Sequence, residues 1–544
     1  MRHRVLVTGQ ISEEGLKVLR SDPDLELVVR PGLKGEELLR EIASADAIVT
    51  RSETAVGKEL MEAAPRLKVI GRAGVGVDNI DLQEASRRGI VVVNAPMGNT
   101  IAAVELTMAL MLSLLRKVPW ARESVLKGEW DRKRFMGVQL YGKTLMVVGL
   151  GRIGSRVAAR ARAFGMNVLA YDPYVKRDKA ESVGARLVDD LLLGLSQADV
   201  LTVHTPLTAE TRGMIGRREL RAMKRGSFVV NCARGGVIDE LALVEAIKAG
   251  HIAGAALDVY CEEPLPLDSP LRDPEVAEKV LFTPHIGANT FEAQDMVAVI
   301  CCKNVLHALK GLPCENAVNL PFCEESLSER ERAFLRLARA MGHIGAGLLE
   351  GRLQRIRVSM KGPLFAEEDV APSFEMPYRY RSYTVAALKG AMEVFGGPEV
   401  SLMSAPVLAE ERGLSVEELT EERGSVFVNT LEISLMAERE ELSVVGTVTE
   451  DMRERVISIG GYYIEFVPKG HLLFFLNRDR PGVIGRVGTL MGDNDINIAN
   501  FALGRKNGGG LAMAVVQLDS PLPRALVEKI SAMDDIIWAR QVEL

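Results

Sequence analysis

Cysteine is scarce in this sequence, and the few cysteines show no pattern of disulfide or metal binding. There are six among 544 residues, at positions 232, 261, 301, 302, 314 and 323, and no two form a CxxC pair. They show no metal-ligand spacing with the seven histidines, so no metal site is expected. A few unpatterned thiols in so long a chain are typical of a protein from the reducing cytosol.

Long hydrophobic runs and a strong charge of one sign are also lacking. The longest apolar run, residues 101–115, contains Glu105 and is too short to span a bilayer. The first residues enter a strand-like run without the apolar core of a signal peptide, which favours a cytoplasmic location. The net charge is −6, so no basic surface for nucleic acid is expected. The length suggests about three to five domains.

One stretch carries the pattern of a dinucleotide-binding unit. The apolar run "KTLMVV" reads as a buried parallel strand, and Gly149, Gly151 and Gly154 follow it at GxGxxG spacing. The next strand, "NVLAYD", ends in Asp172, where a carboxylate should bind the adenosine ribose and repel the 2′-phosphate of NADP. The pattern favours NAD, and the "KR" pair just beyond keeps NADP open as an alternative.

Strand-like and helical stretches alternate after this unit. "ADVLTVHTP", "GSFVVNCARGG", "IAGAALDVY" and "VLFTPHIGA" are separated by helical segments such as "DELALVEAIKAG". This order predicts an α/β fold with a doubly wound parallel sheet, which binds ligands at the carboxyl ends of its strands. The residues expected at those ends are Thr205, Cys232, Ala233, Arg234, Asp258 and His285.

Three polar residues near those strand ends could perform redox chemistry on a hydroxy acid. Arg234 offers a permanent planar charge that can clamp a carboxylate and polarise a carbonyl. His285 can take a hydroxyl proton near neutral pH. Glu263 could pair with this histidine, favour its imidazolium form and fix its tautomer.

The motifs around these residues resemble a known enzyme family. "NCARGGVIDE", "GAALDVYCEEP" and "TPHIGANT", together with "GLGRIG", are similar to motifs of the D-isomer-specific 2-hydroxyacid dehydrogenases over residues 1–315. The resemblance implies that Arg234, Glu263 and His285 are catalytic, with Glu263 chosen over Glu262 because it directly precedes the proline. It implies an NAD site at Val75, Gly149, Gly151, Arg152, Ile153, Gly154, Asp172, Thr205, Cys232, Ala233, Asp258, Gly287 and Ala288.

The resemblance also explains why the glycine fingerprint begins so late in the chain. In this family the substrate-binding domain is split, here into residues 1–97 and 286–315, and is expected to be flavodoxin-like. The NAD-binding Rossmann domain, residues 98–285, is inserted between the two parts. Two helices should connect the two domains and act as their hinge, and the first should begin with Asn99 or Thr100 as N-cap. The active site is then expected in the cleft between the domains.

Further motifs indicate the substrate. "TRSET", "GRAGVGVDNID" and "NAPMGNT" resemble the 3-phosphoglycerate dehydrogenases, which oxidise 3-phospho-D-glycerate to 3-phosphooxypyruvate in L-serine synthesis. The resemblance implies a homo-oligomer, a dimer or tetramer, in which Arg132 reaches the substrate of a neighbouring subunit. The substrate-binding residues it implies are Arg51, Ser52, Gly74, Val75, Gly76, Asn99 and Arg132.

The remainder of the chain suggests regulation. Residues 469–544 follow the βαββαβ order of a ferredoxin-like unit and resemble ACT domains, which bind amino acids. The resemblance implies L-serine as effector, held by Asn477, Asp479 and Asn497. Residues 316–468 resemble the intervening, allosteric-substrate-binding domain of long-form phosphoglycerate dehydrogenases. Within them "FAEEDVAPSFEMPYRYRS" is expected to be an exposed loop.

Two other interpretations stay open at this point. The first is a D-2-hydroxyacid dehydrogenase for another substrate, such as 2-hydroxyglutarate or glycerate, which substrate comparison would reveal. The second is an NAD-sensing corepressor-type binding protein, which would form no NADH with any hydroxy acid. The predicted serine-binding tail argues against both.

Overall fold

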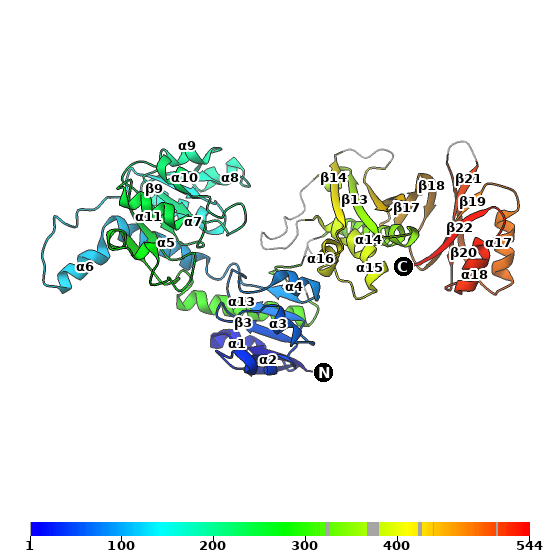
Figure 1. The fold of residues 1–544 in the computed structure, drawn as a ribbon, viewed down its shortest axis with the longest axis horizontal. Coiled ribbons are helices and arrows are strands. Elements are labelled where there is room, and N and C mark those ends of the chain that lie inside the picture. The colour runs from blue at the N-terminus through cyan, green and yellow to red at the C-terminus, as the bar shows by residue number, and fades with distance from the viewer. Residues whose placement is uncertain are drawn as a thin grey trace.

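The computed structural model describes residues 2–544 except 313, 315, 321–326, 367–379, 423–426, 439 and 507–509. Most of the expected exposed loop in the third quarter of the chain, Cys323 and most of the "NGGG" turn therefore lie outside the described residues. The strands that are described form four separate sheets, each from a different stretch of the chain (Figure 1). Within this described part, no helix combines the length and apolar character needed to span a bilayer.

The N-terminal domain is built on a parallel sheet with strand order β2-β1-β3-β4-β5. The strands inside this sheet are largely buried between helices, as parallel sheets require, whereas the edge strand at residues 25–29 is mostly half-buried. Their order is that of flavodoxin-like folds. The strands are β1 (His3–Val7), β2 (Leu25–Val29), β3 (Ala47–Thr50), β4 (Val69–Arg72) and β5 (Val91–Val93), and the helices are α1 (Glu13–Arg20), α2 (Gly35–Ile42), α3 (Lys58–Glu62) and α4 (Leu82–Arg87).

A helix from later in the chain, α13 (Phe291–Leu309), packs against this domain (Figure 1). A Cβ on Gly71 of β4 would lie 2.4 Å from Val305 of α13, so glycine permits this close contact. The return segment continues beyond the predicted boundary at residue 315. The backbone N–H of Val318 donates to Val92, and Asn319 binds the backbone of Val92 and Ile90, so this segment lines the edge strand β5.

The central domain is a larger parallel sheet with strand order β12-β11-β10-β9-β6-β7-β8. The strand order reverses beside β6, the strand that precedes the glycine turn. Sheets of this kind usually bind a dinucleotide at the point where the strand order reverses. Its strands are β6 (Thr144–Val148), β7 (Asn167–Tyr171), β8 (Arg186–Leu187), β9 (Val200–Val203), β10 (Ser227–Asn231), β11 (Ile252–Leu257) and β12 (Val280–Phe282). Its helices are α5 (Thr100–Leu115), α6 (Val118–Leu126), α7 (Arg152–Ala163), α8 (Arg177–Ser182), α9 (Leu191–Leu195), α10 (Arg217–Ala222), α11 (Glu240–Lys248) and α12 (Pro274–Ala277).

The third domain has a mixed sheet of order β14-β13-β15-β16-β17-β18, on which α14 and α15 pack. Only the β13–β14 pair is parallel among the pairs described. Its helices are α14 (Glu329–Leu348), α15 (Ser382–Gly396) and α16 (Ser404–Glu411), and its strands are β13 (Leu353–Lys361), β14 (Ser415–Glu421), β15 (Thr430–Ala437), β16 (Glu441–Val448), β17 (Glu454–Ile459) and β18 (Tyr462–Phe466).

The C-terminal domain has an antiparallel sheet of order β20-β21-β19-β22 with its helices on one face. The order βαββαβ is the predicted ferredoxin-like arrangement. The elements are β19 (His471–Arg478), α17 (Val483–Gly492), β20 (Ile498–Arg505), β21 (Leu511–Leu518), α18 (Arg524–Ser531) and β22 (Ile536–Glu543). The α/β fold predicted from the sequence, with its doubly wound, flavodoxin-like and ferredoxin-like parts, is thus confirmed.

The third and C-terminal domains share one hydrophobic core. Side chains on one face of the C-terminal sheet, including Leu472 and Phe474, are fully buried in the same cluster as Ile464 and Phe466 of β18. The rings of Phe466 and Phe474 meet edge to face, with centroids 5.9 Å apart. The opposite face of the C-terminal sheet is covered by its own helices, so this sheet is buried on both faces.

Candidate active site

A histidine and a glutamate form the centre of the candidate site. His285 follows β12, and its Nδ1 lies 2.7 Å from Oε2 of Glu263, which follows β11. The other oxygen, Oε1, accepts the backbone N–H of Tyr260 at 3.1 Å. Burial has the largest single effect and opposes ionisation of Glu263, but the hydrogen bond and charge of His285, with the Tyr260 N–H and the charge of Arg234, together lower the pKa of this carboxyl. An ionised acceptor requires Nδ1 to donate, which leaves Nε2 as the proton acceptor.

The arginine predicted to be catalytic lies at the same edge of the sheet. Arg234 follows β10, and its Nη1 donates to the carbonyl of Ala233 at 2.8 Å. Its Nε lies 3.6 Å from Oδ2 of Asp78 in the N-terminal domain. The guanidinium therefore faces the second domain of the predicted cleft. Asn231, which the sequence analysis did not single out, fixes this turn by binding the backbone of Ala233 and Arg234.

The loop that carries the histidine has a strained backbone and a buried support. His285 has a φ of 52°, in the left-handed region that non-glycine residues rarely adopt. Asp258 is fully buried and accepts from the Thr283 hydroxyl at 2.6 Å. It also accepts the backbone N–H groups of Ile286 and Gly287. The sequence assigned Asp258 to the cofactor, and the structure gives its carboxylate the role of holding this loop.

The glycine turn after β6 has the geometry that a dinucleotide requires. Gly149 has a φ of 90°, and a Cβ on Gly154 would lie 1.9 Å from the carbonyl oxygen of Gly149. A Cβ on Gly151 would meet nothing within 4 Å, so the backbone there is open to a pyrophosphate. Gly151 also precedes α7, which starts at Arg152 and directs its first N–H groups to the same place. These residues fit an NAD pyrophosphate.

The other residues predicted to bind the cofactor differ in burial and in hydrogen bonding. Asp172 follows β7 and accepts from the backbone N–H groups of Leu150 and Tyr174, which fixes it beside the glycine turn. The Thr205 hydroxyl is buried without a partner among the described residues, as is Nδ1 of His204. Burial lowers the pKa of His204 to about 4, so this imidazole is neutral. Three further predicted positions have side chains in or against the cores, namely Ile153, Cys232 and Ala233. The side chain of Arg152 reaches Met97 of the N-terminal domain, and the carbonyl of Ala288 accepts from the Gln294 amide at 2.8 Å.

The predicted substrate residues gather at the carboxyl edge of the N-terminal sheet. The loop from Gly74 to Gly76 follows β4 and is fixed by Asn94, whose amide donates to the carbonyl of Val75 at 2.6 Å. Asn99 precedes α5, and its Oδ1 is buried without a described partner. Arg51 and Ser52 follow β3. Arg72, the last residue of β4, was missed by the sequence analysis although it stands inside the quoted motif "GRAGVGVDNID".

Arg132 lies apart from the other predicted substrate residues. It follows α6 in an arm that projects from the central domain (Figure 1). The arm exposes large apolar side chains, with Trp130 at 81% and Met136 at 77%. Within one chain, the structure does not bring Arg132 into contact with the catalytic residues.

The three predicted effector residues lie at two separate places in the C-terminal domain. Asn477 is buried at the end of β19, and Asp479 follows in the next loop and pairs with Arg505, with a 2.7 Å distance from its Oδ2 to Nε. Asn497 is exposed before β20 and donates to Asp519 at 2.6 Å. In the described part of the chain, the side chains of these three residues bond to Arg478, Arg505 and Asp519 and not to one another.

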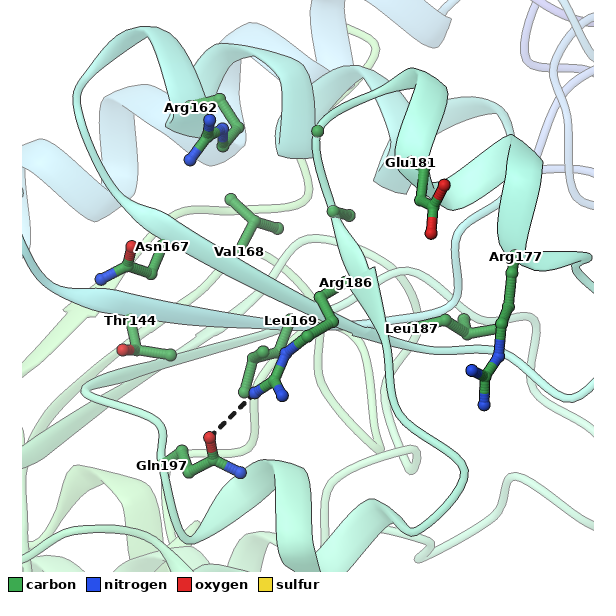
Figure 2. A pocket seen from close by; sticks show the side chains of 12 residues that line it. Thr144, Arg162, Asn167, Val168, Leu169, Arg177, Glu181, Arg186, Leu187 and Gln197 are labelled. Carbon is green, nitrogen blue, oxygen red and sulfur yellow. Dashed lines mark hydrogen bonds between the residues drawn. The ribbon is translucent and has the colours of Figure 1, made fainter.

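A surface pocket of about 570 Å³ lies elsewhere on the central domain (Figure 2). Its lining includes Thr144, Asn167 and Arg186, the first residues of β6, β7 and β8. These are the amino ends of the strands, whereas parallel sheets bind their ligands at the carboxyl ends. The pocket is therefore separate from the catalytic residues. No group of His, Cys, Asp or Glu in the described ranges could hold a metal ion.

Comparisons with known proteins agree with this geometry. Residues 108–287 match the NAD-binding domain of D-isomer-specific 2-hydroxyacid dehydrogenases, residues 331–460 the D-3-phosphoglycerate dehydrogenase intervening domain, and residues 471–535 the ACT domain. The chain is 46% identical to a D-3-phosphoglycerate dehydrogenase of Archaeoglobus fulgidus, over 99% of this chain and 100% of that one. It is 42% identical to one of Methanocaldococcus jannaschii over 98% of both chains.

Solved structures resemble the first part of the chain. A D-lactate dehydrogenase of Aquifex aeolicus, solved with NAD and lactic acid, is 31% identical and superposes with a TM-score of 0.51 over 56% of this chain and 96% of that one. The TT0316 protein of Thermus thermophilus is 38% identical, with a TM-score of 0.53, over 58% of this chain and 99% of that one. By its near full-length relatives and its domain matches, the chain belongs to the D-3-phosphoglycerate dehydrogenases, a branch of the D-isomer-specific 2-hydroxyacid dehydrogenases.

Proposed function

We propose that this protein oxidises 3-phospho-D-glycerate to 3-phosphooxypyruvate with NAD, the first step of the phosphorylated route to L-serine. The observation that carries the proposal is the 2.7 Å His285–Glu263 pair, which lies on the same sheet edge as Arg234. The near full-length relatives named D-3-phosphoglycerate dehydrogenase support the choice of substrate.

The reaction divides among these three side chains. Nε2 of His285 takes the proton of the C2 hydroxyl, and Glu263 stabilises the imidazolium that results. The Arg234 guanidinium holds the substrate carboxylate and polarises the forming C2 carbonyl. NAD, when bound at the glycine turn after β6, supplies the hydride acceptor.

In this proposal the N-terminal domain shares the substrate carboxylate with Arg234. The loop from Gly74 to Gly76 would offer the backbone N–H groups of Val75 and Gly76, since that of Gly74 donates to the carbonyl of Arg72 at 2.8 Å, and Asn99 would contribute an amide. Arg51 and Ser52 bind toward the phosphate end. Arg132 joins the site from the arm of a neighbouring subunit, and the apolar surface of that arm supports a homo-oligomer.

The ACT domain is proposed to sense L-serine. Asn477, Asp479 and Asn497 would hold the amino acid where two C-terminal domains of different subunits meet. In a single chain Asp479 pairs with Arg505 and Asn497 with Asp519. Serine would compete with these internal partners.

The test is an NADH-formation assay with 3-phosphoglycerate, compared with D-lactate, D-glycerate and D-2-hydroxyglutarate. We expect phosphoglycerate to give the highest kcat/KM. Arg234→Ala and His285→Ala should fold but lose activity by about 10²–10³-fold or more. Preference for another hydroxy acid would contradict the substrate, and near wild-type activity of purified His285→Ala would contradict the mechanism.

A further inference from the structure

The pocket on the central domain opens where one edge of the sheet is incomplete. β7 begins at Asn167, but its pairing with β8 begins only at Leu169, because β8 is two residues long. Within the described sheet, Asn167 and Val168 therefore have no neighbouring strand on this side, and both line the pocket. The apolar side chains of Val168, Leu169 and Leu187 also belong to this lining, which encloses about 570 Å³ (Figure 2).

Three arginines from three different elements line the same pocket (Figure 2). Arg162 lies in the last turn of α7, Arg177 is the first residue of α8, and Arg186 is the first residue of β8. Among the described residues of the lining, Glu181 is the one acid. Ligand pockets typically combine an apolar surface with a few charged groups, and guanidinium groups are suited to bind anions.

Two of these arginines have no counter-charge in the described part of the chain. Arg162 has neither a hydrogen-bond nor an ion-pair partner there. Its side chain lies over Gly184, which has a φ of 74°, and a Cβ on that glycine would be 3.1 Å from Cγ and from Nε of Arg162. Nη2 of Arg186 donates to the neutral amide oxygen of Gln197 at 3.0 Å. Uncharged neighbours thus position both guanidinium groups.

The charges around the pocket leave one positive charge unbalanced. Arg177 pairs with Asp189 at 2.9 Å, and this pair is largely exposed, so it contributes little to stability. When Glu181 and Asp189 are set against the three arginines, a single positive charge remains. One carboxylate balances it, and the two oxygens of a carboxylate match the fork of a guanidinium group. A phosphate dianion would instead leave the pocket with an excess negative charge.

We propose that this pocket binds a small organic acid that has one carboxylate and an apolar body. Arg162 and Arg186 hold the carboxylate, and the apolar body rests on Val168 and Leu187. The site is separate from the catalytic residues and from the C-terminal domain. Because the ligand is recognised without any catalytic residue, the inference does not depend on the proposed function.

The test measures binding of benzoate to the full-length protein saturated with NADH, by ligand-observed NMR. Benzamide has the same shape without the charge, and acetate has the charge without the ring, so both should bind at least about tenfold more weakly. Arg162→Gln and Arg186→Gln should each weaken benzoate binding about tenfold or more. Arg221→Gln, at an exposed position of α10 in the same domain, is the matched control and should not change the affinity.

Each contrary result overturns the proposal. Benzoate binding that disappears in Arg234→Gln belongs to the catalytic residues, and binding that is unchanged in both Arg162→Gln and Arg186→Gln lies outside this pocket. Equal affinity for benzamide, or no benzoate binding by the wild type, also contradicts the inference. NADH affinity checks the fold of each variant. If a glutamine variant fails that check, the lysine variant keeps the charge without the fork and should still weaken binding about three- to tenfold.

Discussion

The carboxylate of Asp258 accepts the backbone N–H of Ile286 at 2.8 Å, directly after the histidine proposed as the base. It accepts Gly287 N–H as well, so a buried charge fixes the loop on which His285 takes its left-handed conformation. The position of Nε2 thus depends on a residue that need not touch the substrate. A strained conformation persists only where its surroundings determine it strongly.

Replacing Asp258 by asparagine should therefore impair catalysis. One oxygen becomes an NH2 group, which cannot accept the N–H that it faces, and at least one loop hydrogen bond is lost. We expect kcat to fall about 10–100-fold and the free energy of unfolding to fall by about 1–3 kcal/mol. Steady-state kinetics and thermal unfolding measure these changes. Asp189→Asn, which affects only an exposed pair with Arg177, is the control, and an unchanged kcat in Asp258→Asn would refute this role.

Removal of the Glu263 charge should slow the reaction. The carboxylate holds the His285 ring through Nδ1 and stabilises the imidazolium that forms when Nε2 takes the hydroxyl proton. In Glu263→Gln that charge is lost while the side chain keeps its size. We expect kcat to fall about 10–100-fold with unchanged affinity for NADH. Steady-state kinetics and NADH titration measure these effects, and an unchanged kcat would show that the pair does not support the base.

Acid stability should depend on Glu84, which lies in α4 with its side chain only 9% exposed. Hydrogen bonds from Arg87, which outweigh the opposing effect of burial, and from Arg88 lower its pKa from 4.5 to about 2. Its contribution is therefore complete above pH 4.5 and is lost as pH falls from 4.5 toward 2. At pH 7 Glu84→Gln should lower the free energy of unfolding by on the order of 2–3 kcal/mol. Between pH 4.5 and 2 the free energy of unfolding of this variant should depend less on pH than that of the wild type. Chemical unfolding at several pH values tests this, with exposed Glu59→Gln as the control.

The arm residue Arg132 gives a test of subunit cooperation. If it acts in the neighbouring subunit, Arg132→Ala and His285→Ala chains should complement each other. A mixed dimer would hold one site with both wild-type residues, so re-assembled equal mixtures should regain about a quarter of wild-type activity. An arginine that serves its own chain predicts no recovery. The measurement is NADH formation before and after subunit exchange.

Serine sensitivity should depend on the edge of the ACT domain. We expect L-serine to inhibit the wild-type protein, and Asn497→Ala to weaken that inhibition without changing the uninhibited rate. Asp479→Asn should do the same, because it removes the charge available to the ammonium group. Asn494→Ala, at an exposed position whose amide bonds only within its own helix turn, is the control. Inhibition that survives Asn497→Ala unchanged would place the effector elsewhere.

The sequence was most informative where local pattern determines structure. The GxGxxG spacing gave the turn whose first glycine has positive φ and whose third packs on the strand. The regular alternation of strands and helices gave the sheet edge that carries Arg234 and His285. Arg72 was not predicted as a site residue, because its proximity to Arg51 and Arg234, which come from other parts of the chain, is visible only in the folded structure. The support that Asp258 gives to the histidine loop likewise requires knowledge of the buried backbone N–H groups.

The continuous core of the third and C-terminal domains limits how this protein can be divided. A cut after residue 468 would uncover Phe466 on one piece and Phe474 on the other, together with their apolar neighbours. Each fragment would then present an aggregation-prone surface. The C-terminal domain and the domain before it therefore form one folding unit, and the proposed serine sensing is better tested by point substitution than by truncation.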